Sequence, residues 1–185
     1  MFDKEAFIQE CQDALKVYSP LQAINELVRR AISEPNQLAA AFSPAEGGID
    51  IVHHAPELTI LQLAWPPAIV LYPHDHRMAA VIGLYAGQED NLFYRRSAQG
   101  LKRASGKSLL AGDSVILGPE VIHSVRNPRQ TMTCALHVYT GAFFATPRSE
   151  WDPETLQERP YNIANMLKAF ADANERAKQA GADMG

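Results

Sequence analysis

The chain has 185 residues, of which 46% are hydrophobic and 21% are charged, and its formal net charge is −4. These values are typical of a globular protein that buries one sizeable core, so we expect a single domain over residues 1–185. The 21 acidic residues outnumber the 17 basic ones, and the basic residues occur in pairs rather than clusters. Nucleic-acid binding is not expected, because it depends on clustered Lys and Arg.

Neither a membrane span nor a secretory signal is predicted. No segment approaches about 18 consecutive apolar residues. The N-terminal stretch MFDKEAFIQE carries acidic residues where a signal peptide would place a basic region and an apolar run. The two cysteines, Cys11 and Cys134, form no C-x-x-C pair and fit small buried residues in a reducing compartment. We therefore expect a cytoplasmic protein.

Residues 1–45 predict three helices. Asp3 is the expected cap of the first, Ser19 and Pro20 begin the second, and Pro35 begins a shorter third. Apolar residues recur at helical spacing in the first two. The predicted buried faces are Phe7, Cys11, Ala14, Leu15 and Tyr18 in the first helix and Leu21, Ile24, Leu27, Val28 and Ile32 in the second.

Residues 49–141 read as a β-barrel or sandwich core. Short runs rich in Val, Ile, Leu, Thr and aromatic residues follow one another at spacings near ten residues, separated by Pro, Gly, Asn and Asp. One such run, SLLAGDSVILGP, covers residues 108–119. Residues 150–185 form a tail and return to a helix, with one apolar side made of Ile163, Met166, Leu167, Phe170 and Ala173. Helices that flank the strands indicate a mainly β domain.

The stretch PHDH contains two histidines that could share a metal ion. On a strand, His74 and His76 point to the same face, because side chains alternate with period two. A third imidazole, His123, lies in another apolar strand-like segment. An H-x-H pair alone is weak evidence, since two surface histidines on an edge strand look the same. His53 and His54 are adjacent and fit structural or solvated residues better than ligands.

The surrounding pattern resembles the two motifs of the cupin superfamily. His74, His76 and Gly87 match the first motif, but Ala80 or Val81 stands where it places a Glu ligand. The second motif is matched by Gly112, His123 and Asn127, with Gly118-Pro119-Glu120 in place of its P-x-G turn. This resemblance implies a double-stranded β-helix, the cupin jelly roll, flanked by N-terminal helices and a C-terminal helix.

The missing Glu narrows the resemblance to the thiol dioxygenases, such as cysteine dioxygenase, which bind metal through three histidines only. Trp65 lies nine residues before His74, as a Trp does in those enzymes, and ALHVYTG matches their S-x-H-x-Y segment at His137 and Tyr139. The resemblance implies that Tyr139, backed by His137, orients a bound oxygen species or donates a proton. Ala135 replaces the Ser of that relay, so its far end is lost or filled by water. From the residues alone, His137 and Tyr139 could instead belong to the core.

Cysteine dioxygenases hold the substrate carboxylate with an Arg upstream of the Trp, but residues 31–76 contain no Arg or Lys. Either another residue meets the anionic group, or the substrate is not cysteine. Arg77, Arg95 and Arg96 are the candidates, although strand alternation turns Arg77 away from His76 and lets only one of the other two face inward. All three could equally be solvated or ion-paired. We predict that Arg77, Arg95 and Trp65 contact substrate.

Taken together, the sequence predicts a non-haem iron dioxygenase acting on a small anionic thiol with O2. Fe(II) is the expected cofactor, and three imidazoles also suit Ni, Zn, Mn or Cu. Alternatives are a non-catalytic cupin that binds a metal or small molecule, and a metal-dependent isomerase or hydrolase. A homodimer is compatible with the resemblance. HDHRMAAVIGLYAGQEDNLFYRR and WDPETLQERPYN also resemble an uncharacterised branch of predicted metal-dependent enzymes. In the latter, Trp151 and Pro153 either pack a tail over the barrel mouth or form a structural cap.

Overall fold

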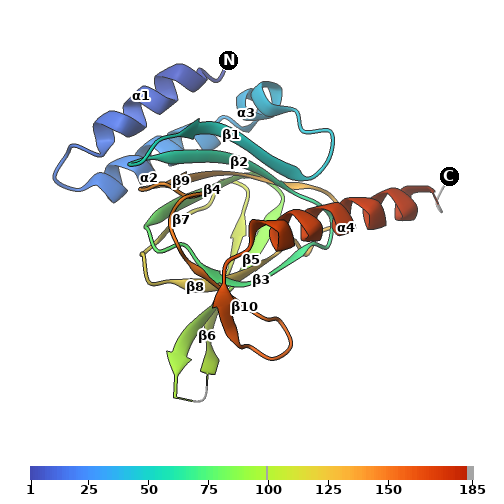
Figure 1. Ribbon diagram of the computed structural model, residues 1–185. Helices are drawn as coiled ribbons and strands as arrows, with labels where there is room; N and C mark the ends of the chain where they lie inside the picture. Colours follow the sequence, from blue (N-terminus) through green and yellow to red (C-terminus); the bar gives the residue numbers. More distant parts are fainter. Residues whose placement is uncertain (99, 183–185) are drawn as a thin grey trace.

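The computed structural model describes residues 1–98 and 100–182 as a β-sandwich flanked by helices (Figure 1). In this described part, three helices come first, eleven strands follow, and one long helix comes last. The helices are α1 (Lys4–Ala14), α2 (Pro20–Ile32), α3 (Pro35–Phe42) and α4 (Ile163–Ala182). The strands are β1 (Gly48–His54), β2 (Thr59–Trp65), β3 (Val70–Asp75), β4 (Ala80–Ala86), β5 (Gln88–Ser97), β6 (Gly100–Leu110), β7 (Ser114–Leu117), β8 (Ile122–Arg126), β9 (Thr133–Tyr139), β10 (Ser149–Trp151) and β11 (Glu158–Pro160).

The N-terminal helices begin at the predicted residues. The Asp3 carboxylate accepts a hydrogen bond from the Ala6 backbone N–H at 3.0 Å and so caps α1. Pro20 and Pro35 occupy the first positions of α2 and α3, where an N–H would have no partner within the helix. The prediction that the buried face of the first helix reaches Tyr18 is wrong. α1 ends at Ala14, the chain turns toward α2, and Tyr18 is fully exposed.

The strands pair in a nested order that defines the fold. β2 pairs with β9, β3 with β8, β4 with β7 and β5 with β6, all antiparallel. The chain therefore runs out through β2–β5 and returns through β6–β9 as one long hairpin. This hairpin is wound into a helix, and the β4–β9 and β5–β8 pairs join its successive turns. The fold is thus a double-stranded β-helix, and the predicted jelly roll with flanking helices is confirmed.

Winding the hairpin produces two facing sheets. One has the strand order β1-β2-β9-β4-β7 and the other β11-β10-β3-β8-β5-β6. The first sheet is covered on both faces, since the N-terminal helices lie on its outer side (Figure 1) and the second sheet faces its inner side. Every residue of β2 and β9 is consequently buried. Strands enclosed in this way read as continuous apolar runs rather than alternating ones.

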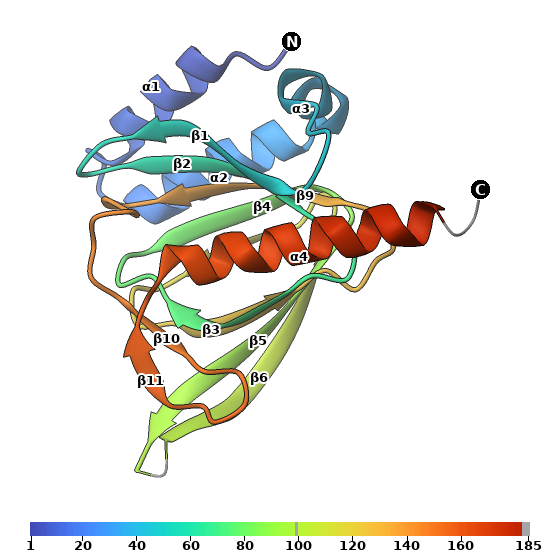
Figure 2. The same ribbon diagram turned by 45° about the vertical axis from the view of Figure 1, so that its right-hand side comes forward.

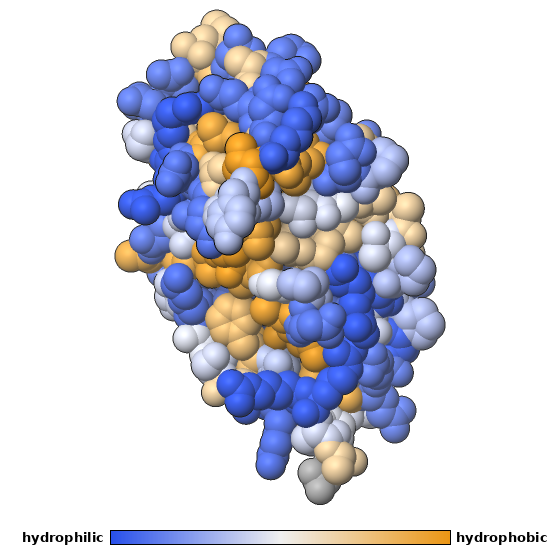
Figure 3. Space-filling view, turned by 90° about the vertical axis from the view of Figure 1, so that its left-hand side faces the viewer, coloured by the Kyte–Doolittle hydropathy of each residue, from blue (hydrophilic) through white to orange (hydrophobic). Residues whose placement is uncertain are grey.

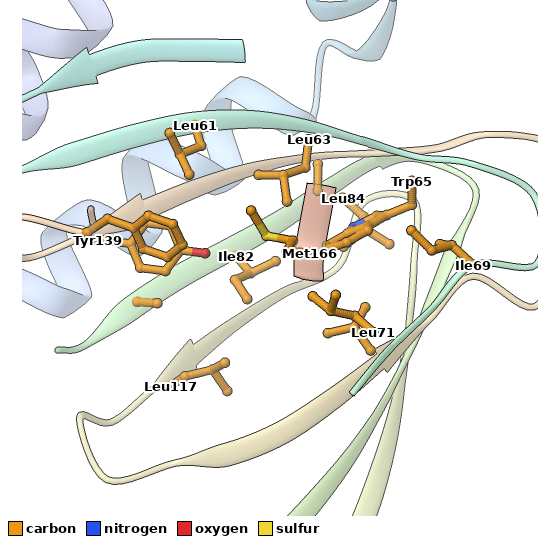
Figure 4. Close-up of a cluster of buried hydrophobic side chains, with 14 of the residues drawn as sticks. Leu61, Leu63, Trp65, Ile69, Leu71, Ile82, Leu84, Leu117, Tyr139 and Met166 are labelled. Carbon is orange, nitrogen blue, oxygen red and sulfur yellow. The ribbon is translucent and has the colours of Figure 1, made fainter. Parts of the chain in front are cut away.

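An apolar core fills the space between the sheets, and Figure 4 shows part of it. Leu61 of β2 and Ile82 of β4 point toward Leu71 of the opposite sheet. α4 runs along the side of the sandwich between the two sheets (Figure 2) and adds its own side chains to this core. The ring of Phe170 stacks on Trp65 with centroids 5.3 Å apart. α4 thereby closes one side of the interior.

The apolar side of α4 is narrower than the sequence predicted. Met166, Phe170 and Ala173 are buried as expected, but the side chains of Ile163 and Leu167 are 40% and 53% exposed. Only a thin strip of this helix faces the sandwich. The placement of the two residues on the buried side was therefore wrong.

The predicted strand over residues 108–119 is also wrong in its extent. Gly112 has a φ of +93°, which a residue with a Cβ rarely adopts, and it forms a turn that separates β6 from β7. β6 extends backward from this turn and forms a long hairpin with β5. β10 and β11, which no sequence pattern indicated, extend the same sheet beyond β3.

The surface carries both hydrophilic areas and exposed apolar side chains. Figure 3 shows a band of hydrophobic residues across one face, bordered by hydrophilic residues. Among the described helices, none is both long and apolar enough to cross a lipid bilayer.

The contact between α2 and β4 leads to a test of the fold. A Cβ added at Gly83 of β4 would lie 2.3 Å from Cγ1 of Val28 in α2. Valine in a helix is held in one rotamer and cannot readily turn aside. Gly83→Ala should therefore lower the free energy of unfolding by about 1–3 kcal/mol in urea denaturation. Gly48→Ala is the matched control, because a Cβ on this other strand glycine meets nothing within 4 Å. Equal stability of the two variants would contradict this packing.

Candidate metal centre

The three predicted histidines lie together inside the sandwich. In the ladder between β3 and β8, His74 stands directly opposite His123, and His76 follows the end of β3. One ligand atom from each of the three lies within 4.8 Å of the others. The Nε2 atoms of His76 and His123 are 3.4 Å apart. Three imidazoles that converge in this way could hold one metal ion.

Burial keeps all three imidazoles uncharged. Their exposed fractions are 5% for His74, 3% for His76 and 1% for His123. Removal from water lowers the pKa of His74 to about 4 and lowers the pKa values of His76 and His123 well below 6.5. Mutual repulsion of the protonated rings contributes further for His76 and His123. A neutral imidazole has the free lone pair that metal coordination requires.

Hydrogen bonds to Nδ1 fix the ring orientation of two of the histidines and leave their Nε2 atoms free for a metal. Nδ1 of His74 lies 3.0 Å from the backbone oxygen of Tyr72, which can only accept a hydrogen bond. Nδ1 of His123 lies 2.7 Å from Oδ1 of Asn91. In both rings the proton is therefore assigned to Nδ1, and Nε2 carries the lone pair that faces the cluster. Such outer partners are usual for metal-binding histidines.

In the described part of the chain, no carboxylate joins the histidines in place of the absent Glu of the first motif. Ala80 is fully buried and belongs to the core between the sheets, whereas Val81 packs on the other face against the helices. Among the described residues, the group that could hold a metal consists of the three histidines alone. The ligand set is thus neutral and leaves the full charge of a bound ion to be met by other groups.

His137, Tyr139 and Trp65 lie beside the cluster, as the resemblance implied. Nδ1 of His137 is 3.0 Å from the phenolic oxygen of Tyr139. The Tyr139 ring meets the His76 ring edge to face, with centroids 5.0 Å apart. All three predicted residues line a small interior cavity together with the histidine cluster. Burial raises the pKa of Tyr139, so its hydroxyl keeps its proton at neutral pH.

The sequence reasoning missed two polar residues behind the cluster, Glu89 and Asn91. Both are on β5 and both are buried. Oε1 of Glu89 accepts a hydrogen bond from Nδ2 of Asn91, and its Oε2 accepts one from Nε1 of Trp65, each at 2.8 Å. Strand alternation places Glu89 and Asn91 on the same face. Polar residues at successive inward positions of a strand were the signal that could have revealed them.

Two of the predicted arginines are paired with carboxylates away from the cavity. Nε of Arg77 lies 2.7 Å from Asp75 and its Nη1 lies 3.6 Å from Glu120. Arg96 pairs with Glu158 at 2.8 Å and with Asp75 at 3.4 Å. The third, Arg95, is exposed. None of the three is among the described residues that line the interior cavity.

Arg148 is a buried cation that the sequence reasoning did not consider. Its side chain lies between two rings, with Cζ 3.8 Å from the centroid of Phe143 and 3.9 Å from that of Tyr161. Arg148 is only 9% exposed, and its Nη1 has no hydrogen-bond partner among the described residues. Its charge contributes to lowering the pKa values of His74 and His76, so it acts on the cluster electrostatically.

Tyr161 lines two cavities of different size. The inner one has a volume of about 20 Å³, which is room for roughly one water molecule, and it contains the histidine cluster. The outer one has a volume of about 390 Å³ and is lined by Arg148 and the segment around it. Tyr161 lines both, and its hydroxyl donates to Sδ of Met166 at 3.1 Å.

Trp151, predicted either to help close the barrel mouth or to form a cap, has a structural role. It is buried beside Leu101 and Ile122 in a small cluster separate from the main core. Its strand, β10, pairs with β3 at His74 through Glu150. Pro153, named with it, is exposed. The tail therefore extends the second sheet next to the metal centre.

Comparisons with known proteins reveal distant structural similarity. No family model matches the chain. A cupin superfamily protein of Desulfitobacterium hafniense has a TM-score of 0.46 and 10% identity, over 56% of this chain and 86% of that protein. An uncharacterised Klebsiella pneumoniae protein with a double-stranded β-helix domain has a TM-score of 0.42 and 17% identity, over 53% and 75% of the two chains. Oxalate decarboxylase of Bacillus subtilis, which contains Mn(II) centres, has a TM-score of 0.43 and 15% identity, over 54% and 27%.

The lowered pKa values predict acid sensitivity of the metal-free protein. Between pH 6.5 and about 4, the unfolded chain binds protons at His74, His76, His123 and His137, while the folded chain does not. Stability must therefore fall as the pH falls through this range. Burial raises the pKa of Glu89 to about 7. This one group therefore binds a proton more readily in the folded chain and partly offsets the loss of stability. The free energy of unfolding should drop by at least about 2 kcal/mol between pH 7 and pH 5.

This dependence is measured by urea denaturation at a series of pH values in the presence of a chelator. His74→Phe removes one of the four titrating imidazoles and should flatten the pH profile. A free energy of unfolding that stays constant between pH 7 and pH 5 would show that these histidines are not buried in neutral form.

Proposed function

We propose that this protein is a non-haem iron dioxygenase of the cysteine dioxygenase-like type, which oxidises a small, anionic, thiol-bearing substrate with O2. The observation that carries the proposal is the convergence of three neutral imidazoles without a carboxylate, within the electrostatic influence of the buried Arg148. A neutral ligand set favours an anionic substrate, because the substrate then supplies the negative charge that the ligands lack.

The residues His74, His76 and His123 fit a divalent ion, since one ring nitrogen of each lies within 4.8 Å of the others and the Nδ1 atoms of His74 and His123 are hydrogen-bonded elsewhere. A bound iron(II) ion supplies a centre that lowers the pKa of a coordinating thiol and brings the thiolate and O2 together. The chain supplies the rest of the site. Zn, Ni, Mn and Cu also suit three imidazoles, so metal analysis must accompany every assay.

Tyr139 supplies a hydroxyl group at the inner cavity. Its pKa is raised by burial, so it remains protonated and can donate or accept a hydrogen bond. His137 fixes the phenol through the 3.0 Å contact to Nδ1. Because Tyr139 packs against His76, the hydroxyl is held close to the position where reactants meet. We assign to Tyr139 the orientation of the oxygen reactant, with His137 as its support.

Arg148 is the residue that we assign to the substrate anion. Burial lowers its pKa, which indicates that its charge is poorly compensated by the protein itself. A carboxylate would provide the missing partner for Nη1. Phe143 and Tyr161, the rings that hold the guanidinium, both line the inner cavity. The substrate thiol and carboxylate would thus lie at the metal and at Arg148, respectively.

The assignment of the reaction is tested with an oxygen electrode. Iron-loaded protein should consume O2 with 3-mercaptopropionate or cysteine, and more slowly with cysteamine, which has no carboxylate for Arg148. His123→Ala should lose both metal and O2 consumption, whereas His54→Ala, a histidine outside the cluster, should keep both. Iron-loaded protein that consumes no O2 with these compounds or with a wider panel of thiols and diketones would refute the dioxygenase proposal.

If Arg148 binds the substrate anion, its loss should raise the KM without removing the metal. Arg148→Met should raise the KM for a carboxylate-bearing thiol by at least roughly tenfold, because the substrate anion loses its buried partner. Metal content should not change, since Arg148 is not a ligand. Arg95→Met is the matched control, because Arg95 is exposed and lines neither the inner nor the outer cavity. Equal KM values for the two variants would remove Arg148 from the substrate site.

A second candidate is a metal-binding protein without catalysis. The observation that favours it is the inner cavity, which at about 20 Å³ has room for roughly one water molecule and is too small for an organic substrate. Elemental analysis separates the two functions. Stoichiometric zinc that does not exchange with iron would favour the non-catalytic protein.

A further inference from the structure

Glu89 is a buried carboxylate without a cationic partner. It is 0% exposed, and no Lys or Arg of the described residues forms an ion pair with it. Burial accordingly raises its pKa to about 7. A carboxylate in such surroundings destabilises a fold unless its oxygens are hydrogen-bonded. One of its oxygens connects through Asn91 to His123, and the other lies near His137. These two connections suggest a role for Glu89 in the metal centre.

The first connection runs through Asn91 to His123. Asn91 donates from Nδ2 to Oε1 of Glu89, which only accepts when ionised. The amide oxygen of Asn91 must therefore point the other way, toward Nδ1 of His123 at 2.7 Å. That oxygen also accepts only, so the His123 proton is held on Nδ1. The lone pair on Nε2 then faces His76, where a metal would be bound.

The second connection runs through His137 to Tyr139. Burial lowers the pKa of His137 to about 3, so at neutral pH its ring carries one proton. Nε2 has no hydrogen-bond partner among the described residues and lies 4.0 Å from Oε2 of Glu89. The negative charge attracts the N–H to Nε2. Nδ1 is then an acceptor, and the Tyr139 hydroxyl donates to it at 3.0 Å.

We infer that Glu89 is a positioning residue that sets the ring tautomers of both His123 and His137, and through them the metal affinity and the hydrogen-bond direction of Tyr139. The inference rests on the proposed metal centre. Glu89 also stands at the far end of the Tyr139–His137 hydrogen-bond chain, where Ala135 has no polar group to offer. A single carboxylate thus orients a metal ligand on one side and a hydroxyl group of the site on the other.

Glu89→Gln separates this role from simple packing. The glutamine side chain has nearly the same shape but only one acceptor oxygen, whereas Trp65 and Asn91 both donate to Glu89. If that oxygen stays with Trp65, the new amide N–H₂ faces Asn91 and the Asn91 amide must turn over. Asn91 would then present Nδ2 to His123 and drive the His123 proton to Nε2, where it blocks the metal.

The direct measurement is the ring tautomer in the metal-free protein. Nitrogen-15 shifts of the histidine rings distinguish a nitrogen that carries a proton from one that does not, and they are recorded at about pH 9, where Glu89, with its pKa of about 7, is ionised. In the native chain, His123 should carry its proton on Nδ1 and His137 on Nε2. In Glu89→Gln, the proton of His123 should move to Nε2. The control is Asp90→Asn, whose carboxylate bonds Gln88 and Ser108 instead of the network.

The second measurement is zinc affinity by competition with a chelator. Glu89→Gln should weaken zinc binding by about 10–100-fold, as expected for loss of a group that orients a metal ligand. Glu89→Asp keeps two acceptor oxygens and should recover part of the affinity. Asp90→Asn should bind zinc like the native chain. A role in packing alone would lower the affinity in Glu89→Asp as much as in Glu89→Gln.

The outcomes distinguish this inference from the proposed function. Native His123 protonated on Nε2, or native His137 protonated on Nδ1, would overturn the inference even if Glu89→Gln failed to fold. Unchanged tautomers and zinc affinity in Glu89→Gln would also overturn it. A native chain that binds zinc with the expected tautomers but consumes no O2 would support the role of Glu89 while refuting the dioxygenase.

Discussion

The antiparallel pairing of β3 with β8 is the constraint on which the metal centre depends. It places His74 opposite His123, and the turn after β3 adds His76 from the same side. Both strands are inner strands of their sheet, and their histidine side chains lie in the interior, where water is excluded. Burial then makes the imidazoles neutral, and neutrality provides the lone pairs. The electrostatic properties of the site therefore follow from the register of one strand pair.

The fold and the three histidines could be predicted from sequence because their signals are local. An H-x-H spacing, a run of short apolar strands and proline at helix starts are each contained within a few residues. β10 and β11 have three residues each; β10 forms on the sheet edge that β3 offers, and β11 in turn pairs with β10. The outward face of β6 is largely polar, so its length depends on pairing with β5 rather than on apolar residues of its own.

Arg148, to which we assign the substrate anion, could not be identified from sequence. Arg148 follows β9 by nine residues and acquires its significance only where the chain folds back and Tyr161 covers it. We considered Arg77 because it follows a ligand in the sequence, although strand alternation turns it away from His76. Its side chain instead binds Asp75. Distance in sequence from the motif was a poor guide to distance from the metal centre.

Asp75, the residue between the two histidines of PHDH, faces away from the metal centre and is almost fully buried. Its Oδ1 accepts a hydrogen bond from the backbone N–H of Ser149, the residue after Arg148. One tripeptide therefore fixes two ligands on one face and anchors the arginine segment on the other. The candidate metal site and the proposed anion site are consequently linked through this one residue. Transplanting the three histidines into another double-stranded β-helix would reproduce the metal position, but the graft would lack a charge beside it unless residues 148–161 were moved as well.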